Sequence, residues 1–464
     1  MRNLAGATSP CERDGAGYNR PMTKLVLAAL PLLFATPAAA QPIAPTDDLR
    51  ATIAADMPGL TAIYRDLHAH PELSFAEVRS AAIMAAAARK AGFEVTEKVG
   101  KTGIVAVLKN GPGPTVLIRA DMDALPVVEQ TGLAFASKVR ATPASGVETG
   151  VMHACGHDTH MTAWIETARL LAARKGQWSG TLVMIGQPAE ETGQGSEAML
   201  KDGLYTRFPQ PDFALAFHNM SAVPAGTIAY ASGPAMANVD SIDIEVRGVG
   251  GHGAAPHTTK DPVVLAAAIV MRLQTLVSRE NNPLDPAVVT VGSFHAGSKY
   301  NIISDSAKLQ LTVRSFSDAQ RQRLLDGIKR VVAGEAMASG IPEALTPRIA
   351  LGEGFTPALI NEPGFAEQVI APLRTRFGEE RVLLLPPIMA GEDFSRFRLA
   401  DPENVQSLML WVGGEDPATI AAARRDGTVL PSLHSPFWAP DAEKVIAAAA
   451  EALTSAALRL MPKS

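Results

Sequence analysis

Four side chains that could bind metal or act as nucleophiles lie within eight positions of the stretch VMHACGHDTHMTA. They are His153, Cys155, His157 and His160, in a chain of 464 residues with ten histidines and two cysteines. The thiol could be a disulfide partner, a nucleophile, a metal ligand or a core residue. A helix is expected to begin just after it, and a helix N-terminus favours the thiolate, which is the form that binds metal.

Acidic side chains follow two of the apolar segments that we predict as strands. Asp121 and Asp123 come after TVLIRA, and the pair Glu190-Glu191 comes after TLVMIGQPA. Neighbouring side chains on an extended backbone point to opposite sides, so one glutamate could bind a metal while the other acts as a base. A solvated charge pair in a loop is the alternative. His218 follows a third such segment, DFALAF.

The elements that must position these groups alternate between apolar strands and helices. This order predicts an α/β fold with a mostly parallel sheet, in which functional groups gather at the carboxyl ends of the strands. We assign this catalytic domain to residues 41–236 and 348–464. Between them, residues 237–347 show half-exposed strands in the order β-α-β-β-α, which predicts an inserted α+β domain.

The N-terminal segment resembles an export signal. Residues 22–40 have a short positive start, an apolar core and small residues before Gln41, which predicts a signal peptide and a periplasmic or secreted protein. The apolar run is short and broken by proline, so we expect no membrane span. Cys11 precedes the expected cleavage site, so the mature protein would hold Cys155 alone and form no internal disulfide.

The composition argues against a polyanionic partner. The net charge is −5, aromatic residues make up 5% of the chain, and there is no long run of lysine or arginine. We therefore expect no binding of nucleic acid.

Several motifs together resemble a known family. The chain is similar to the metallo-aminoacylase and carboxypeptidase superfamily, in the amidohydrolase branch of hippurate hydrolases, N-acyl-L-amino acid amidohydrolases and auxin-conjugate hydrolases. The matching stretches lie in the family's order from about Asp66 to Phe437 and are DLHAHPELSFAE, RADMDALP, MHACGHDTHMT, QPAEETGQG, FHNM, GVGGHGAAPH, MAGEDFSRF and LHSPFW.

The resemblance implies a metallopeptidase-like catalytic domain and a ferredoxin-like lid or dimerisation domain. It implies Glu190 as the general base and Asp123 as a catalytic residue that orients a ligand. It implies a pair of divalent ions (Zn, Mn, Co or Ni), bridged by the Cys155 thiolate, because this branch has a sulfur where relatives have a carboxylate. The implied metal ligands are Cys155, His157, Glu191, His218 and His434.

The stretch GVGGHG matches the dinucleotide-binding pattern G-x-G-x-x-G, but no helix starts at its third glycine, so the context fails. The resemblance instead implies a lid loop from which His252 reaches the active site of a second subunit in a homodimer or homotetramer. It also implies that Asn301 helps to hold the substrate carboxylate. A glycine turn with a capping histidine and an asparagine turn remain alternatives.

The function implied is metal-dependent hydrolysis of the amide bond of N-acyl (or N-aminoacyl) amino acids. A dipeptidase or carboxypeptidase on the same scaffold is the first alternative. A non-catalytic binding protein is disfavoured because Glu190 is present, and a cysteine hydrolase would use Cys155 as the nucleophile. The remaining histidines are interpreted as structural or peripheral: His68, His70, His153, His160, His257 and His295.

Overall fold

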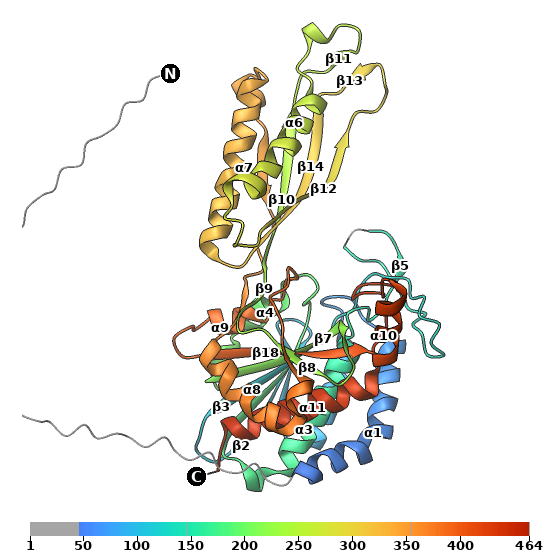
Figure 1. The fold of residues 1–464 in the computed structure, drawn as a ribbon, viewed down its shortest axis with the longest axis vertical. Coiled ribbons are helices and arrows are strands. Elements are labelled where there is room, and N and C mark those ends of the chain that lie inside the picture. The colour runs from blue at the N-terminus through green and yellow to red at the C-terminus, as the bar shows by residue number, and fades with distance from the viewer. Residues whose placement is uncertain (1–45, 145, 353, 464) are drawn as a thin grey trace, which may run out of the picture. The chain divides into compact units, whose positions relative to one another are not determined.

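A computed structural model describes residues 46–144, 146–352 and 354–463. The signal peptide predicted at 22–40 and the residue Cys11 lie outside these described residues. The described chain contains two large sheets (Figure 1). Helices pack on each sheet, and separate hydrophobic clusters fill the space between each sheet and its helices.

The larger sheet has eight strands in the order β1-β2-β6-β3-β7-β18-β8-β17. Its centre, β6-β3-β7-β18, is parallel, which confirms the predicted mostly parallel sheet. β1 and β2 add antiparallel strands at one edge, and the charged, half-exposed sequence of β1 gave no apolar signal of a strand. The strands are β1 (Glu94–Val99), β2 (Gly103–Asn110), β3 (Thr115–Asp121), β6 (Gly180–Gln187), β7 (Phe213–Pro224), β8 (Ile228–Tyr230), β17 (Val382–Leu384) and β18 (Gln406–Glu415).

Helices cover both faces of this sheet, so its central strands are apolar on both sides. In β3, Ile118 packs with the cluster under α1, α2, α3, α8 and α11, whereas Leu117 packs with the cluster under α4, α5 and α9. The helices are α1 (Thr46–Ala69), α2 (Val78–Lys90), α3 (His157–Ala173), α4 (Gly195–Lys201), α5 (Leu204–Arg207), α8 (Pro363–Phe377), α9 (Ser395–Leu399), α10 (Pro417–Asp426) and α11 (Ala442–Leu460).

The smaller sheet is antiparallel, with strands in the order β12-β14-β10-β15 and with α6 and α7 on one face. Along the chain its elements run β-α-β-β-α-β. The fourth strand begins at Arg348, directly after the predicted end of the insertion at 347. The elements are β10 (Asn238–Arg247), α6 (Pro262–Thr275), β12 (Val288–Ala296), β14 (Ser306–Ser315), α7 (Asp318–Ala338) and β15 (Arg348–Leu351).

Three short strand pairs lie outside the two large sheets: β4 (Arg140–Ala141) with β5 (Thr149–Gly150), β9 (Gly233–Met236) with β16 (Leu359–Asn361), and β11 (Gly251–His252) with β13 (Ile302–Ile303).

One helical stretch among the described residues, Pro262–Glu280, is long and apolar enough, by length and composition, to cross a membrane. A third of it (33%) is buried within the molecule. Its inner side chains, such as Leu265 and Ile269, belong to the cluster that packs on the small sheet.

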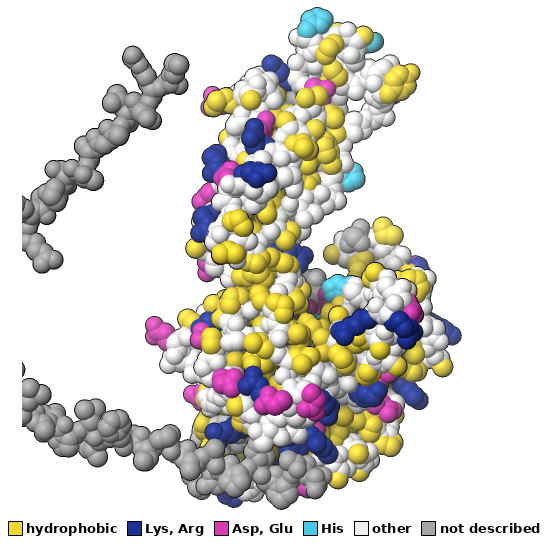
Figure 2. Space-filling model, viewed as in Figure 1, with side chains coloured by type: hydrophobic (Ala, Val, Ile, Leu, Met, Phe, Trp, Pro, Cys, Tyr) yellow, Lys and Arg dark blue, Asp and Glu magenta, His cyan; other side chains and the backbone are white. Residues whose placement is uncertain are grey.

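On the face shown in Figure 2, basic and acidic side chains are interspersed.

Candidate metal centre

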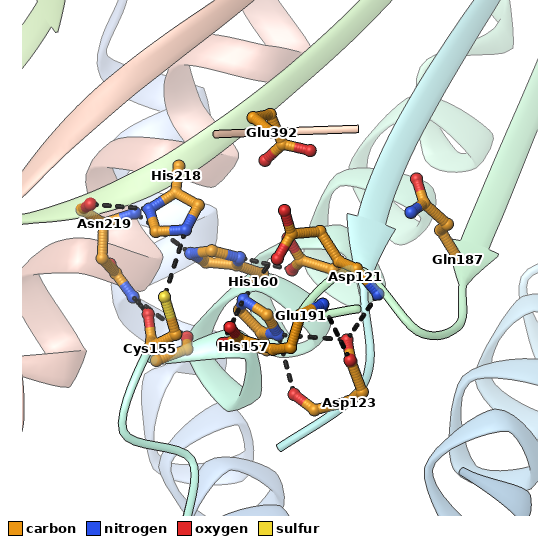
Figure 3. Close-up of polar contacts among 12 residues, drawn as sticks. Asp121, Asp123, Cys155, His157, His160, Gln187, Glu191, His218, Asn219 and Glu392 are labelled. Carbon is orange, nitrogen blue, oxygen red and sulfur yellow. Dashed lines mark hydrogen bonds and ion pairs between the residues drawn. The ribbon is translucent and has the colours of Figure 1, made fainter. Parts of the chain in front are cut away.

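Side chains from the ends of three neighbouring strands meet at one edge of the large sheet (Figure 3). β6, β3 and β7 are adjacent and parallel, so their carboxyl ends coincide. Asp121 ends β3, Glu191 follows β6 and His218 lies on β7. The N-terminus of α3 reaches the same edge and brings Cys155 and His157, so the predicted gathering of these groups is what the structure shows.

The sulfur of Cys155 lies between two imidazoles. Its Sγ is 3.4 Å from His218 Nε2 and 3.2 Å from His434 Nε2, on segments 63 and 279 positions away. The N–H of His434 donates to Ala154 O over 2.9 Å, and its φ of 68° is in the left-handed region. This backbone contact fixes the distant C-terminal loop against the turn that carries the thiol.

Two buried atoms in the cluster have no hydrogen-bond partner among the described residues: His157 Nε2 and Glu191 Oε1, 3.9 Å apart. The ligand atoms of Cys155, His157 and His218 lie within 4.8 Å of one another, as do those of Cys155, Glu191 and His434. Leaving a buried polar atom unpaired is costly, and a cation bound among sulfur, nitrogen and oxygen donors removes that cost. The donor set therefore fits divalent metal.

Hydrogen bonds on the far side of two imidazoles orient their free nitrogens into the cluster. His157 Nδ1 donates to Asp123 O and His218 Nδ1 donates to Asn219 O, each over 2.7 Å. Because a carbonyl oxygen only accepts, Nδ1 carries the proton in the neutral ring, and Nε2 keeps its lone pair. Metal-binding histidines are held in this way.

The acidic groups lie too close together to ionise freely. Burial and the nearby charges of Glu392 and Glu191 raise the pKa of Glu190 well above its usual range. Burial also raises the pKa of Glu191, to about 8, despite the opposing charge of His157. Burial would lower the pKa of His157, but Asp121 and Asp123 raise it to about 10. In the absence of a cation the two glutamates therefore tend to hold their protons, and a bound cation would favour their ionised forms.

The pKa of the Cys155 thiol does not follow the expectation that a helix N-terminus favours the thiolate. Burial and the charges of Glu191 and Glu190 raise the pKa of Cys155 well above its usual range. That expectation is wrong for the side chains alone, because Cys155 is 5% exposed and faces carboxylates. Burial lowers the pKa of His434 to about 4. Burial is also the main cause that lowers the pKa of His218, and both shifts favour the neutral ring, which is the form that binds metal.

The turn that carries Glu190 and Glu191 is held from below by Asp123. The N–H groups of the two glutamates donate to Asp123 Oδ1 and Oδ2 over 3.1 and 3.0 Å. Gly195 closes the turn where a Cβ would lie 1.5 Å from Pro188 O, so no larger residue fits. Gly193 has a φ of 65°, as expected for the tight turn beneath the pair.

A buried charge cluster next to the centre was not predicted. Arg119 Nη1 is 2.6 Å from Asp121 Oδ2, and its Nη2 is 2.9 Å from Glu392 Oε1. Asp393 accepts from Gln187 Nε2 over 2.6 Å. Asp121, His218 and Glu392 also place ligand atoms within 4.8 Å of one another. The motifs RADMD and MAGEDF hold Arg119, Asp121, Glu392 and Asp393, but nothing in their local spacing showed that they meet.

His160, interpreted as structural or peripheral, is buried beside the centre. Its Nδ1 is 2.5 Å from Asp121 Oδ1, and its Nε2 accepts from the N–H of Asn219 over 3.1 Å. Both nitrogens are therefore engaged, which leaves none for a metal. Burial lowers the pKa of His160 to about 3, although Asp121 opposes this effect.

The two residues assigned to substrate binding lie on the small domain. His252 and Asn301 are exposed and lie side by side, because β11 pairs with β13 and the N–H of Gly253 donates to Asn301 O over 2.9 Å. Neither side chain is among those that line the cavity at the metal centre. The structure therefore brings these two residues together, and it does not bring them to the centre of their own chain.

A cavity of about 550 Å³ opens over the centre. Among the residues that line it, Arg314 comes from β14 of the small domain and was not predicted; its Nη1 donates to Met389 O over 2.6 Å. The charged and ligating side chains on its wall are Cys155, Glu190, Glu191, Glu197, His218, Arg314, Glu392, Arg396 and His434, and apolar side chains include Met220, Met236, Ile388, Trp411 and Leu433.

Comparison with known proteins places these features in context. The profile described as Peptidase family M20/M25/M40 matches residues 117–426. Thermostable carboxypeptidase 1 of Saccharolobus solfataricus is 38% identical over 72% of this chain and 81% of its own length. Hippurate hydrolase of Campylobacter jejuni is 37% identical over 72% of this chain and 84% of its own.

A solved structure is also similar. The YXEP protein of Bacillus subtilis, described as a dinuclear metal binding peptidase from the M20 family, superposes with a TM-score of 0.70 at 30% identity. The match covers 88% of this chain and 99% of that protein.

Proposed function

The chain belongs to peptidase family M20/M25/M40, and from this premise we propose that it releases free amino acids from N-acyl amino acids by hydrolysing the amide bond. It is a metal-dependent amidohydrolase, and its cofactor is divalent metal, with two ions per active site. The observation that carries the proposal is the set of sulfur, imidazole and carboxylate atoms around Cys155, where His157 Nε2 and Glu191 Oε1 have no hydrogen-bond partner in the part of the chain that the structure describes.

We assign the five predicted ligands to two overlapping groups. One is Cys155, His157 and His218, and the other is Cys155, Glu191 and His434. Cys155 belongs to both, which supports a sulfur shared between the two ions. Zn, Mn, Co or Ni would suit these mixed donors. When bound, divalent ions supply positive charge that polarises the scissile carbonyl and makes water more acidic.

Glu190 is the residue that we assign as the general base. It lines the cavity, and no hydrogen bond to its side chain is present among the described residues, so its carboxylate is free to accept a proton from water. Burial and neighbouring carboxylates raise its pKa, which suits a group that holds the proton and passes it to the leaving nitrogen. Asp123 holds the backbone of this turn in place.

The charges of the cavity favour an N-acyl amino acid as the substrate. Arg314 has no carboxylate within ion-pair distance among the described residues, so it can bind the free carboxylate of the amino acid. A free α-amine would need an unpaired acid. Glu190 and Glu191 are assigned to catalysis and to metal binding, and the other two acids of the wall are paired, Glu197 with Lys201 at 2.7 Å and Glu392 with Arg119 at 2.9 Å. A dipeptidase or carboxypeptidase is the second candidate, which the similarity to a thermostable carboxypeptidase supports.

A substrate panel tests this proposal. The purified enzyme, loaded with Zn²⁺ or Mn²⁺, is assayed on N-acetyl, N-benzoyl and indole-acetyl amino acids and on unblocked dipeptides. We expect kcat/KM to be highest for an N-acyl amino acid. A preference for free dipeptides would favour the second candidate.

Removal of metal separates this enzyme from a cysteine hydrolase. We expect EDTA to abolish activity and Mn²⁺ or Zn²⁺ to restore it. A hydrolase that uses Cys155 as its nucleophile would keep its activity in EDTA. Measurement of activity and of bound metal before and after dialysis decides between the two.

We propose that the small domain forms a homodimer. α6 exposes an apolar stripe of Val264 (66% exposed), Ala267 and Met271 (72%), at the spacing of one helix face. β12 is the edge strand beside it and exposes Phe294. A second copy would cover this stripe and edge. The exposed position of His252, away from the cavity of its own chain, supports its assignment to a second subunit's active site; Asn301 would act there with it.

We also propose that the protein is exported, on the pattern of residues 22–40. Expression of the full chain followed by fractionation and N-terminal mass analysis tests this. We expect the mature protein to begin at Gln41 in the periplasm or medium, and an uncleaved chain in the cytoplasm would contradict export.

A further inference from the structure

Three consecutive backbone amides after β6 each donate to a buried carboxylate. The N–H groups of Glu190 and Glu191 donate to the two oxygens of Asp123. The N–H before them, of Ala189, donates to Glu77 Oε1 over 2.8 Å, across 112 positions of sequence. The turn that presents both glutamates is therefore anchored at three successive points, and Glu77 supplies the first.

Glu77 is fully buried, and one of the three hydrogen bonds that its carboxylate accepts comes from this turn. It precedes α2, yet its side chain does not cap that helix. The free amides of Arg79 and Ser80 donate to Glu72 over 2.8 Å each, so Glu72 has that task. Glu77 Oε1 accepts from Phe75 and Ala189, and Oε2 accepts from the hydroxyl of Thr102.

Ala189 needs such an anchor because its backbone is strained. It has a φ of 49° and is fully buried. The left-handed region costs a non-glycine residue about 1–2 kcal/mol, so the conformation persists only where its surroundings hold it. Ala189 reverses the chain just before Glu190, and its conformation decides where the two glutamates point.

We propose that Glu77 is a positioning residue for Glu190 and Glu191. It acts because its side chain is long enough to place an acceptor oxygen at the turn (its reach), and not because it is charged. The hydrogen bond to Ala189 fixes the turn from which one glutamate faces the cavity and the other faces Cys155. Burial raises the pKa of Glu77 to about 7, which agrees with a neutral acceptor being sufficient. This inference rests on the proposed roles of Glu190 and Glu191.

Two substitutions separate reach from charge. Glu77→Gln keeps the acceptor oxygen at the same distance but removes the charge. Glu77→Asp keeps the charge but withdraws the carboxylate by one carbon–carbon bond, about 1.5 Å. Since a displacement of about 1 Å can cost a hundredfold in rate, we expect Glu77→Asp to lower kcat by 10- to 100-fold with KM within threefold, and Glu77→Gln to keep the parental kcat.

A second measurement does not depend on activity. Titration of each metal-free protein with Co²⁺, followed by visible absorption, reports how well the ligand Glu191 is placed. We expect at least tenfold weaker Co²⁺ binding for Glu77→Asp and parental binding for Glu77→Gln. If the parent hydrolyses no N-acyl amino acid, the proposed function fails, and the Co²⁺ series still tests Glu77.

Glu72→Gln is the matched control, because it alters a carboxylate of the same segment that caps α2 and does not contact the turn. It is expected to lower Tm without changing kcat or Co²⁺ affinity. Loss of activity in Glu77→Gln with parental activity in Glu77→Asp would show that charge matters and would overturn the proposal. Equal effects, or no effect, in both variants would also overturn it. If Glu77→Asp does not fold, a tenfold lower kcat in Glu77→Gln overturns the proposal and a parental kcat supports it.

Discussion

At the scale of single residues, Glu190 and Glu191 are neighbours in sequence with different surroundings. Both line the cavity, but Glu191 Oε2 lies 3.5 Å from His434 Nε2, whereas Glu190 forms no ion pair among the described residues. We expect Glu190→Gln to keep its metal and to lower kcat by about 10²–10⁴-fold, because an amide cannot accept the proton. Steady-state kinetics and metal analysis check this.

The control for this prediction is Glu197→Gln. Glu197 lines the same cavity but pairs with Lys201 at 2.7 Å. The kcat of the Glu197→Gln enzyme should stay within a few-fold of the parental kcat. A Glu190→Gln enzyme that works at near the parental rate would remove Glu190 from the role of base.

Arg314 offers a second test at this scale. If it binds the substrate carboxylate, Arg314→Met removes a charge-assisted hydrogen bond of about 1.5–3 kcal/mol, and KM should rise about 10- to 100-fold. Arg396→Met is the control, because Arg396 lines the same cavity but already has a carboxylate partner, Glu197, at 3.7 Å. The assignment is wrong if both variants raise KM equally.

The site residues that could be predicted from the sequence are those with a reactive or metal-binding side chain at the end of a predicted strand or at the start of a predicted helix. Cys155 and Glu191 lie at strand or helix ends, where an apolar run stops and chemistry can begin. Arg119, Glu392 and Glu77 could not be found in this way. Arg119 and Glu392 meet across 273 positions, so their roles depend on the folded chain and leave no local pattern.

At the scale of elements, His68 connects α1 to the start of α3. Its Nδ1 is 2.7 Å from Asp158 and its Nε2 is 3.0 Å from Glu129, all within the core. Burial would lower the pKa of His68, but its bonds to Asp158 and Glu129 raise it to about 10. The sequence interpretation of His68 as structural agrees with these contacts.

This contact predicts a pH dependence of stability. The pKa of His68 is about 10 in the folded protein and 6.5 in the unfolded chain. The stabilisation of the folded state by protonated His68 is therefore complete below pH 6.5 and is lost as pH rises through 10. His68→Gln should therefore lower the free energy of unfolding by about 3–5 kcal/mol at pH 6 and by much less near pH 10. Urea unfolding, followed by the fluorescence of the buried Trp164, Trp178, Trp411 and Trp438, measures this.

His70→Gln is the control for that series. Its side chain is 54% exposed, so its removal should change stability little at any pH. A His68→Gln deficit that stays constant from pH 6 to pH 10 would contradict the shifted pKa of His68.

The predicted elements agree best where the apolar pattern is strong. α7, the last helix of the predicted β-α-β-β-α order, runs from Asp318 to Ala338, because Ser317 caps it and its apolar residues repeat with the helical period. β1 was missed, since the strand lies at an edge and carries charged residues on its exposed side. The antiparallel pairing of β2 with β6 follows from contacts across the sheet, which strand order along the chain does not contain.

At the scale of the whole molecule, the proposed dimer makes a direct prediction. Val264→Glu combined with Met271→Glu places charges on the exposed stripe of α6. We expect the parent to be a dimer and this variant a monomer by light scattering after size exclusion, because a buried, unpaired carboxylate is costly. Met337→Glu, which alters an 82%-exposed side chain on α7, is the control and should leave the dimer intact.

Mixed dimers test whether His252 acts across the interface. Glu190→Gln lacks the proposed base, and His252→Asn lacks the lid histidine, so each homodimer should be nearly inactive. A dimer with one subunit of each kind contains one active site that combines an intact Glu190 with the other subunit's intact His252. We therefore expect co-expression to restore activity well above that of either homodimer. If His252 serves its own chain, neither site of the mixed dimer is complete, and the mixture stays as inactive as its parts.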